Sequence, residues 1–499
     1  MSEILNRKRL VIVGCGASAV LALVALANYQ RDPSTLSTRH TAAIRLGITI
    51  LDDNPSRPCG LAYSAIHPSL VLNVPAMRMG AFSDDPAHFF RWLQHTSEWK
   101  NLHPAFAELA IAGDDFFPRA IYGEYLTDVF DHAVQSLRVA GHTVELQSER
   151  VSAVKKGTSA NAIQVITASG LCYEADTVLM ATGNYPSLLD TQQSSAILSS
   201  PYVDEALHLN WKKINHLLIV GSGLSLVDAV QLAMSQGFEG TFHVVSRHGL
   251  LPHAHGTSHH SDVPVLSTQA KKASALLSDI RQYIERNEKN AIAWQCSVNQ
   301  LREQNNYLWS GLNPKARHRL KRALPWWNSV RHRIPASTKT MLDNLQVQGR
   351  LCIHRATVNA IQITHNGFIL SLAASRSKNA RLEIIADKAI MCMGYRAGFS
   401  VVQDLCNGLL DDSTALTANF IGNNHYRISS KQEIYGIGPA LAGVLFETTA
   451  IHEIREQAVC IAKAIFTTAA DNTNTNTNTN TNTNTNTNST QSVGVACTE

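Results

Sequence analysis

The sequence predicts an α/β protein with two Rossmann-like dinucleotide-binding domains and a helical insertion. Three observations lead to this prediction. An apolar strand, a G-x-G turn and a helical run follow one another near the N-terminus, and the same series recurs from residue 216. Of the 499 residues, 44% are hydrophobic and only 16% are charged, which favours packed cores over disorder. A chain of this length should form about two to four domains.

The first unit opens with the apolar run 10–13 and the loop Gly14-Cys15-Gly16-Ala17-Ser18-Ala19. In such a loop the first glycine allows a tight turn and the second lets a pyrophosphate approach the backbone. The small third residue, here Ala19, lets the helix pack on the strand, so that the positive helix end faces phosphate. We therefore predict that Gly14, Gly16 and Ala19 bind a dinucleotide.

An acidic residue should end the second strand of this unit and hold a ribose. Asp52, at the end of the apolar segment 48–53, meets that expectation. It follows the glycine loop by more than the usual interval of about 20 residues, and we interpret the polar stretch 28–41 as a loop insertion that accounts for the excess.

Residues 10–27 contain no charge and end in Ala25-Leu26-Ala27, so they also resemble a signal peptide. A buried strand and helix would be equally apolar, and the nucleotide-binding unit needs this segment. We therefore expect a cytoplasmic protein. Nine cysteines, an odd number without C-x-x-C pairs, agree with a reducing compartment and predict neither a disulfide framework nor a thiolate zinc site.

The second unit consists of the apolar strand 216–220, the turn Gly221-Ser222-Gly223 and a helix. Leu226 stands where a third small residue is usual, which should loosen the fit of helix to strand. Asp228, on that helix, is predicted to be an internal cap partner or a ligand contact.

Ser246 and Arg247 follow the next strand in place of an acidic residue. A hydroxyl and a guanidinium suit a 2′-phosphate, so NADPH is favoured over NADH at Gly221, Gly223, Ser246 and Arg247. The alternative is that Arg247 is a solvated charge at a strand end.

Two further segments, 175–183 and 386–394, each predict a buried strand that ends in a glycine turn. Such turns let the backbone lie close to a cofactor, and we include Thr182 and Gly183 among the binding residues. Two nucleotide-binding units in one chain indicate a pyridine-nucleotide flavoprotein, in which hydride passes from nicotinamide to flavin. The predicted cofactors are FAD and either NADPH or NADH.

The predicted domains follow from this order. They are an FAD-binding first part at 1–205, an NAD(P)H-binding domain at 206–390 with a helical insertion at about 266–339, a return to the FAD-binding domain at 391–468, and a disordered Asn/Thr-rich tail at 469–499. We expect the insertion to pack over the second domain, with its tryptophans in the core. The alternating Asn/Thr tract offers no apolar face to bury, which predicts disorder.

Beyond the two glycine loops, several short blocks resemble one known family. They are Gly60-Leu61-Ala62-Tyr63, Leu72-Asn73-Val74-Pro75 through Met79, Phe117-Pro118-Arg119 with Tyr122-Gly123-Glu124, Ser246-Arg247-His248-Gly249-Leu250-Leu251-Pro252, Arg331-His332-Arg333, Tyr435-Gly436-Ile437-Gly438-Pro439 and Glu447-Thr448-Thr449-Ala450. From about residue 9 to 465 the chain resembles the bacterial FAD/NAD(P)-binding flavoproteins that include FAD-dependent urate hydroxylases and an amino-acid (aspartate) N-monooxygenase. It departs from that family at Leu226, at the loop 28–41 and at Val330.

The resemblance implies FAD at the first loop, NAD(P)H at the second, and oxygen insertion into a small polar substrate through a flavin C4a-hydroperoxide. It places Asn73 and Met79 beside the isoalloxazine. Urate hydroxylation to 5-hydroxyisourate, a step of purine degradation, is the leading expectation, and N-hydroxylation of an amino acid is the alternative. A non-catalytic flavin-binding regulatory protein is a further alternative, whereas the lack of C-x-x-C argues against a disulfide reductase.

Within the family-like blocks, the candidate catalytic residues are Arg119, Tyr122 and His332, and Arg78 and His67 could also contact substrate. Gly436 and Gly438 are predicted to contact FAD, in a loop followed by a helix that starts near residue 442 or 443. The positive end of that helix would stabilise anionic reduced flavin.

The expected partners are a small substrate and O2. We expect no nucleic acid, since 43 basic and 39 acidic residues give a net charge of only +4. We also expect no membrane. No metal is expected, because His253, His255, His259 and His260 lie in a Gly/Ser/Pro-containing loop, where titrating loop histidines are the simpler interpretation.

Overall fold

The computed structural model describes most of the chain. The described residues are 7–29, 44–65, 67–104, 108, 111–159, 162–187, 194–256, 262–365, 367–372, 381–413, 416 and 425–478, with the side chains of 468–478 left out.

The first half of the molecule is built on a parallel sheet with the strand order β16-β7-β1-β2-β3. Its strands are β1 (Arg7–Val13), β2 (Arg45–Asp52), β3 (Thr143–Ser148), β7 (Thr177–Met180) and β16 (Ile434–Gly436). Both faces are covered, which is why the inner strands β1 and β7 contain the apolar runs 10–13 and 178–180. The α/β fold class is confirmed.

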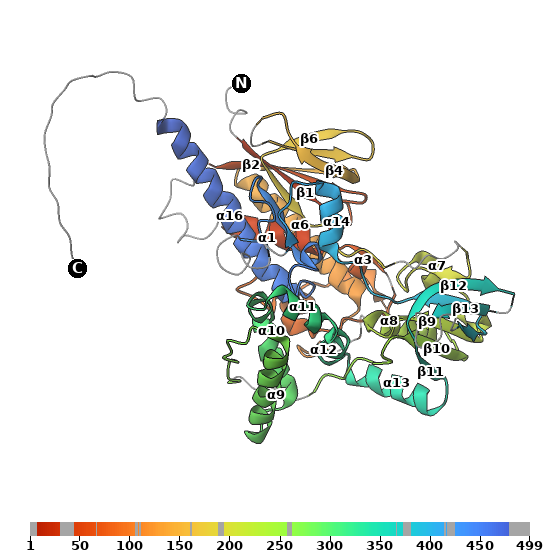
Figure 1. Cartoon of the computed structure of the whole chain (residues 1–499). Coiled ribbons are helices and arrows are strands. Elements are labelled where there is room, and N and C mark those ends of the chain that lie inside the picture. Colours follow the sequence, from red (N-terminus) through yellow and green to blue (C-terminus); the bar gives the residue numbers. More distant parts are fainter. Residues whose placement is uncertain are drawn as a thin grey trace, which may run out of the picture.

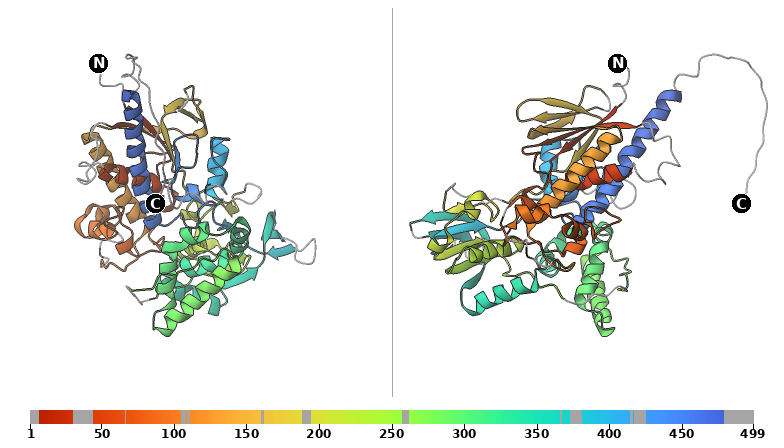
Figure 2. Two further views of the ribbon diagram at one scale, coloured as in Figure 1. Left: turned by 60° about the vertical axis from the view of Figure 1, so that its left-hand side comes forward. Right: turned by 180° about the vertical axis from the view of Figure 1, so that it is seen from behind.

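Three helices pack together on one face of this sheet: α1 (Ala17–Tyr29), α6 (Arg119–Val139) and α16 (Ile451–Asn478) (Figure 2, right). The other face carries α14 (Gly398–Cys406) and an antiparallel sheet of β4 (Val151–Lys156), β5 (Ile163–Thr167) and β6 (Cys172–Ala175). Residues 10–27, which resemble a signal peptide, form the central strand β1 and the buried helix α1.

Short helices precede α6 along the chain. They are α3 (Leu61–Ser64), η2 (Ala76–Arg78), α4 (His88–His95) and α5 (Glu98–Leu102). Aromatic side chains of α4 and α5 join the core beneath α6, with Phe89 and Trp99 fully buried. Most of the predicted loop insertion, from residue 30 to 43, lies outside the described residues.

The second half repeats the plan with the strand order β11-β10-β9-β15-β8, all parallel. The strands are β8 (Ile197–Leu198), β9 (His216–Val220), β10 (Thr241–Ser246), β11 (Leu351–Arg355) and β15 (Lys388–Met391). One face is covered by α8 (Leu224–Ser235) and α13 (Ala336–Val347), next to the short elements α7 (Asp204–Leu207) and η4 (Trp211–Lys213). The other face carries an antiparallel sheet of β12 (Val358–Thr364), β13 (Gly367–Leu372) and β14 (Arg381–Ile384).

Two observations on the two sheets bear on the predictions. The chain already enters the second sheet at β8, before the expected boundary at 205. The segments 175–183 and 386–394 are buried strands that end in glycine turns, as predicted, with Gly183 at φ +70° and Gly394 at φ +79°.

The helical insertion contains α9 (Ala273–Lys289), α10 (Trp294–Ser310), α11 (Pro314–Lys321) and α12 (Leu324–Arg331). It lies below the first half in Figure 1, and its core includes Phe446 of the returning segment. Trp309 Nε1 donates to the Val444 carbonyl at 3.1 Å. The insertion also contacts the second domain, as expected: Gln295 Nε2 of α10 donates to the Ala254 carbonyl at 3.1 Å. The returning segment is a second partner that the sequence did not indicate.

The end of the chain departs from two expectations. The helix predicted to start near 442 or 443 starts instead at Ile451, after η5 (Gly438–Leu441), because Gly443 adopts φ +108° and turns the backbone. Helix α16 continues to Asn478, ten residues into the segment predicted to be disordered, and residues 479–499 lie outside the described part. Within the described residues, no helix has both the length and the apolar character needed to cross a membrane.

Candidate active site

The first glycine loop has a geometry that only glycine permits. Gly14 adopts φ +102°, and a Cβ there would lie 2.5 Å from the Ala181 carbonyl oxygen at the end of β7. A Cβ on Gly16 would lie 3.4 Å from the Gly60 Cα. Ala19 is fully buried in the first turns of α1. The N-terminal end of α1 therefore stays open to a phosphate while strand and helix remain tightly packed.

Asp52 ends β2 beside this loop. Its carboxylate accepts from the backbone N–H groups of Cys15 and Asn54, each at 2.8 Å. These bonds fix the carboxylate at the edge of the glycine loop and leave it acceptor capacity for a ribose hydroxyl. Its role in binding the cofactor stays a prediction, and its position at the edge of the loop fits that role.

Four other predicted residues converge on the same edge of the sheet. Thr182 and Gly183 follow β7, and no atom lies within 4 Å of where a Cβ on Gly183 would be, so the backbone there faces open space. Gly436 ends β16. Gly438 adopts φ +62° and donates its N–H to Gln457 Oε1 at 2.7 Å. The carboxyl ends of β1, β2, β7 and β16 thus form one cradle that fits FAD.

The second glycine loop has the same form. Gly221 adopts φ +113°, and a Cβ there would lie 2.0 Å from the Cys392 carbonyl oxygen after β15. A Cβ on Gly223 would meet no atom within 4 Å, so the backbone there faces open space, as the approach of a pyrophosphate requires. Leu226 is fully buried in the core beneath α8, so the larger side chain is packed.

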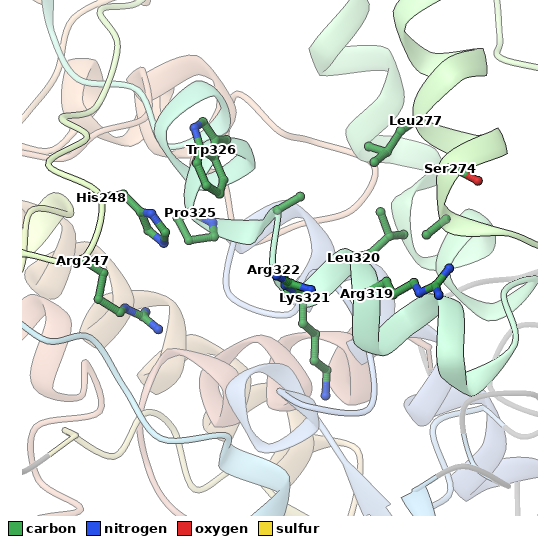
Figure 3. A pocket seen from close by; sticks show the side chains of 12 residues that line it. Arg247, His248, Ser274, Leu277, Arg319, Leu320, Lys321, Arg322, Pro325 and Trp326 are labelled. Atoms are coloured by element: carbon green, nitrogen blue, oxygen red, sulfur yellow. The ribbon is translucent and has the colours of Figure 1, made fainter. Parts of the chain in front are cut away.

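The two predicted 2′-phosphate residues differ in their surroundings. Ser246 Oγ accepts from the Gly249 N–H at 3.0 Å and so shapes the turn after β10. Arg247 is exposed and lines a cavity of about 900 Å³ between this turn and the insertion (Figure 3).

The loop predicted to lie beside the isoalloxazine meets the second half of the chain. Met79 is buried and Asn73 is partly buried. The Asn73 carbonyl accepts from His255 Nε2 at 2.9 Å. His255 thereby has a structural partner. His259 and His260 lie outside the described residues, and no cluster of metal-ligating side chains occurs within the described part of the chain.

The Arg119 side chain is buried and paired, so it does not face an open site. It is buried, and its Nη2 lies 3.0 Å from Asp228 Oδ2, which also accepts from the Tyr202 hydroxyl at 2.5 Å. Burial opposes the charge, but Asp228 outweighs it and holds the pKa of Arg119 above its usual value. This arrangement joins α6 to α8 and does not support a catalytic role for Arg119. Asp228 binds across the two halves and does not cap its own helix.

Tyr122 lies in an aromatic core. Its ring centroid is 4.8 Å from that of Tyr63 and 5.0 Å from that of Phe89. The side chain is fully buried, and burial raises the pKa of its hydroxyl well above the usual value. A group that stays protonated inside a ring cluster is not placed to act as an acid or base. His67 likewise bridges Ser69 at 2.8 Å and Gln236 at 3.1 Å.

His332 remains a candidate. It follows α12, and burial together with the cations of Arg331 and Arg302 lowers its pKa well below the usual value. The imidazole is therefore neutral at pH 7. Arg78, on the cofactor loop, is exposed.

Sequence reasoning missed a buried carboxylate pair where the insertion meets α16. Glu447 pairs with Arg331 and accepts from Asn305 Nδ2 at 2.8 Å. Glu453 lies 3.8 Å from Arg302. Burial and the charge of Glu447 raise the pKa of Glu453 to about 8, so it holds a proton near neutrality. Both Arg331 and Glu447 lie in family-like blocks, but nothing local indicated that they pair across 116 positions.

The comparisons with known proteins agree with this geometry. A family model described as FAD-NAD(P)-binding matches residues 11–185. Residues 11–185, which include the first glycine loop, Asp52 and β7, are therefore similar to an FAD-NAD(P)-binding family. None of the curated proteins matches the sequence.

Solved structures match almost the whole chain. An ornithine N-hydroxylase from Kutzneria sp. 744, with reduced FAD, NADP+ and L-ornithine, has a TM-score of 0.56 and 13% identity over 92% of this chain and 99% of that one. An L-lysine 6-monooxygenase from Pseudomonas syringae has a TM-score of 0.58 and 14% identity over 92% and 99%. A bacillithiol disulfide reductase from Staphylococcus aureus has 0.52 and 13% over 93% and 99%.

At identities this low, the structural similarity establishes the fold alone. The chain has the fold of FAD/NAD(P)-binding monooxygenases, and the family model and the glycine cradles support FAD and NADPH as its cofactors. The disulfide reductase shows that the same fold also carries a different chemistry.

Proposed function

We propose that this protein is an NADPH-dependent FAD monooxygenase that hydroxylates the amine nitrogen of a small amino acid. The observation that carries the proposal is the match over nine-tenths of the chain to an N-hydroxylase structure that holds reduced FAD, NADP+ and L-ornithine. The comparisons give urate hydroxylation no such support, and they favour the N-hydroxylation alternative.

Different residues of this chain would bind the two cofactors and position them. Gly14, Gly16 and the start of α1 would hold FAD, which, once reduced by the nicotinamide cofactor, would activate O2 for transfer of one oxygen atom to the substrate. Gly221 and Gly223 would hold the nicotinamide cofactor at the start of α8. The loop at Asn73 is fixed by the hydrogen bond from His255. It would position the isoalloxazine ring of FAD between the two halves of the chain.

The buried polar groups near the insertion would form hydrogen bonds with the substrate amine. His332 is neutral at pH 7 and can exchange hydrogen bonds without adding positive charge. Glu453 holds a proton and Glu447 stays ionised between arginines, so the region offers both a donor and an acceptor. The insertion over this region would exclude water and limit loss of peroxide.

The test is turnover by the purified yellow protein with NADPH or NADH. Oxygen uptake, peroxide release and hydroxylamine formation are followed with L-ornithine, L-lysine, L-aspartate and urate in separate reactions. We expect one amino acid to accelerate NADPH oxidation and yield a hydroxylamine with little peroxide. Urate-dependent turnover to 5-hydroxyisourate would overturn the proposal, as would complete peroxide release with every compound or reduction of a disulfide substrate.

A matched pair of variants tests whether His332 belongs to the active site. His332→Asn should lower hydroxylamine formation by about tenfold or more if the imidazole contacts substrate or cofactor. His318→Asn, on the exposed surface of α11, should leave it unchanged. Equal effects of both variants would remove His332 from the site.

A further inference from the structure

The cavity beside Arg247 has an unusual lining. Its cationic side chains are Arg247, Arg319, Lys321 and Arg322, and among the residues that the structure describes no aspartate or glutamate lines it. Cations that line a cavity without a carboxylate repel one another, so this arrangement favours a bound anion. The cavity of about 900 Å³ has room for a nucleotide fragment.

The four cationic side chains have no ion pair or hydrogen bond with any other described residue. They come from two elements far apart in the sequence. Arg247 directly follows β10, whereas the other three lie at the end of α11 and just after it. Figure 3 shows Arg247 on one side of the cavity and the α11 residues across it.

Aromatic and apolar groups complete the lining. The His248 ring lies 4.6 Å from the ring of Trp326, centroid to centroid. Trp326 is 51% exposed, although we expected the tryptophans of the insertion to lie in the core. An exposed indole beside unpaired cations provides a stacking surface for a base next to a phosphate site.

We infer that the helical insertion forms the second wall of the site for the adenosine 2′-phosphate of NADPH, with Arg319, Lys321 and Arg322 facing Arg247 across the cavity. The end of β10 is where a 2′-phosphate is expected in such a domain, so Arg247 supplies one wall. The insertion residues then act as determinants of NADPH over NADH, and Trp326 supports the adenine. The inference depends on the nicotinamide cofactor and is independent of which substrate is hydroxylated.

The probe is adenosine 2′,5′-bisphosphate, with 5′-AMP as the ligand that lacks the 2′-phosphate. Binding of each to the FAD-loaded protein is measured by titration calorimetry. We expect the wild type to prefer the bisphosphate. The triple variant Arg319→Gln, Lys321→Gln, Arg322→Gln should weaken bisphosphate binding by about tenfold or more and leave 5′-AMP binding within about twofold, because only charge-assisted contacts to the 2′-phosphate are removed.

Three further variants sharpen the result. Lys315→Gln, on the same helix but outside the cavity, is the matched control and should change neither affinity. Trp326→Ala should weaken both ligands by a similar factor of about fivefold, since both carry the adenine. Arg322→Gln alone keeps the test informative if the triple variant does not fold, which the FAD absorbance would show.

Two outcomes would overturn the inference. In one, the triple variant binds the bisphosphate as tightly as wild type while Arg247→Gln does not, which leaves the insertion without a role. In the other, the wild type binds inorganic phosphate in the cavity but does not distinguish the bisphosphate from 5′-AMP. Neither outcome depends on hydroxylation, so failure of the proposed activity would be seen separately.

Discussion

At the scale of single residues, Gly14 has the strictest steric requirement in the first glycine loop. Gly14→Ala would place a Cβ 2.5 Å from the Ala181 carbonyl oxygen at φ +102°. Backbone must move to relieve this contact, which should cost about 3 kcal/mol or more of unfolding free energy and abolish FAD retention. The flavin absorbance of the purified variant and its denaturation midpoint measure both effects.

Gly170→Ala is the matched control for that prediction. Gly170 also has positive φ, at +89°, but its Cβ would meet no atom within 4 Å, and it lies in the turn between β5 and β6. It should cost only about 1–2 kcal/mol and leave FAD content unchanged. Full FAD retention by Gly14→Ala would show that the predicted loop does not hold the flavin.

Glu453 gives a prediction about pH at the same scale. Burial and the neighbouring Glu447 raise its pKa to about 8 in the folded protein, above the unfolded value near 4.3. Between these values the folded state holds a proton that the unfolded state has lost, so this group's stabilisation is complete at low pH and is lost as pH rises towards 8. The slope is at most about 1.4 kcal/mol per pH unit.

Glu453→Gln should therefore flatten the fall in stability between about pH 5 and 8, as measured by denaturant unfolding. The exposed neighbour Glu456→Gln should leave the profile of the wild type in place. An identical profile for wild type and Glu453→Gln would mean that Glu453 is ionised in the folded protein and paired with Arg302.

At the scale of elements, the parts that the sequence predicts correctly are local ones. The strand and glycine turn at 10–16 and at 216–223 lie within one short stretch, so periodicity and turn chemistry indicate them directly. The pairing of α6 with α8 could not be read in this way, because Arg119 and Asp228 are 109 positions apart. Arg119 therefore looked like a free cation in a family-like block, whereas the structure gives it a buried partner.

The pair of α6 and α8 gives a prediction that separates structure from catalysis. Arg119→Met leaves Asp228 buried without its cation and should lower the unfolding free energy by about 3–5 kcal/mol. The exposed pair of Arg91 with Asp85 is the control, and Arg91→Met should cost no more than about 1 kcal/mol. Lost turnover at unchanged stability in Arg119→Met would restore its catalytic assignment.

At the scale of the whole molecule, the two sheets lie in different hydrophobic clusters, and polar contacts link the two halves. The first core surrounds β1 and α1, and the second surrounds β9 and α8. Arg119 with Asp228, and His255 with the Asn73 carbonyl, are polar links between the halves. The insertion is bound to the first half through Glu447, yet it borders the cavity at Arg247 of the second half. No local pattern in 266–339 could indicate this bridging position, because it depends on partners elsewhere in the chain.

Separate cores predict separate responses to ligands. A ligand that binds only the folded form stabilises by about 2.7 kcal/mol at 100 times its dissociation constant. Scanning calorimetry should therefore show FAD removal lowering a transition that adenosine 2′,5′-bisphosphate barely shifts, while the bisphosphate raises a second one. Arg119→Met should widen the gap between the two transitions, since it removes a link between the halves. A single transition that moves equally with either ligand would show that the halves unfold as one unit and that these links couple them fully.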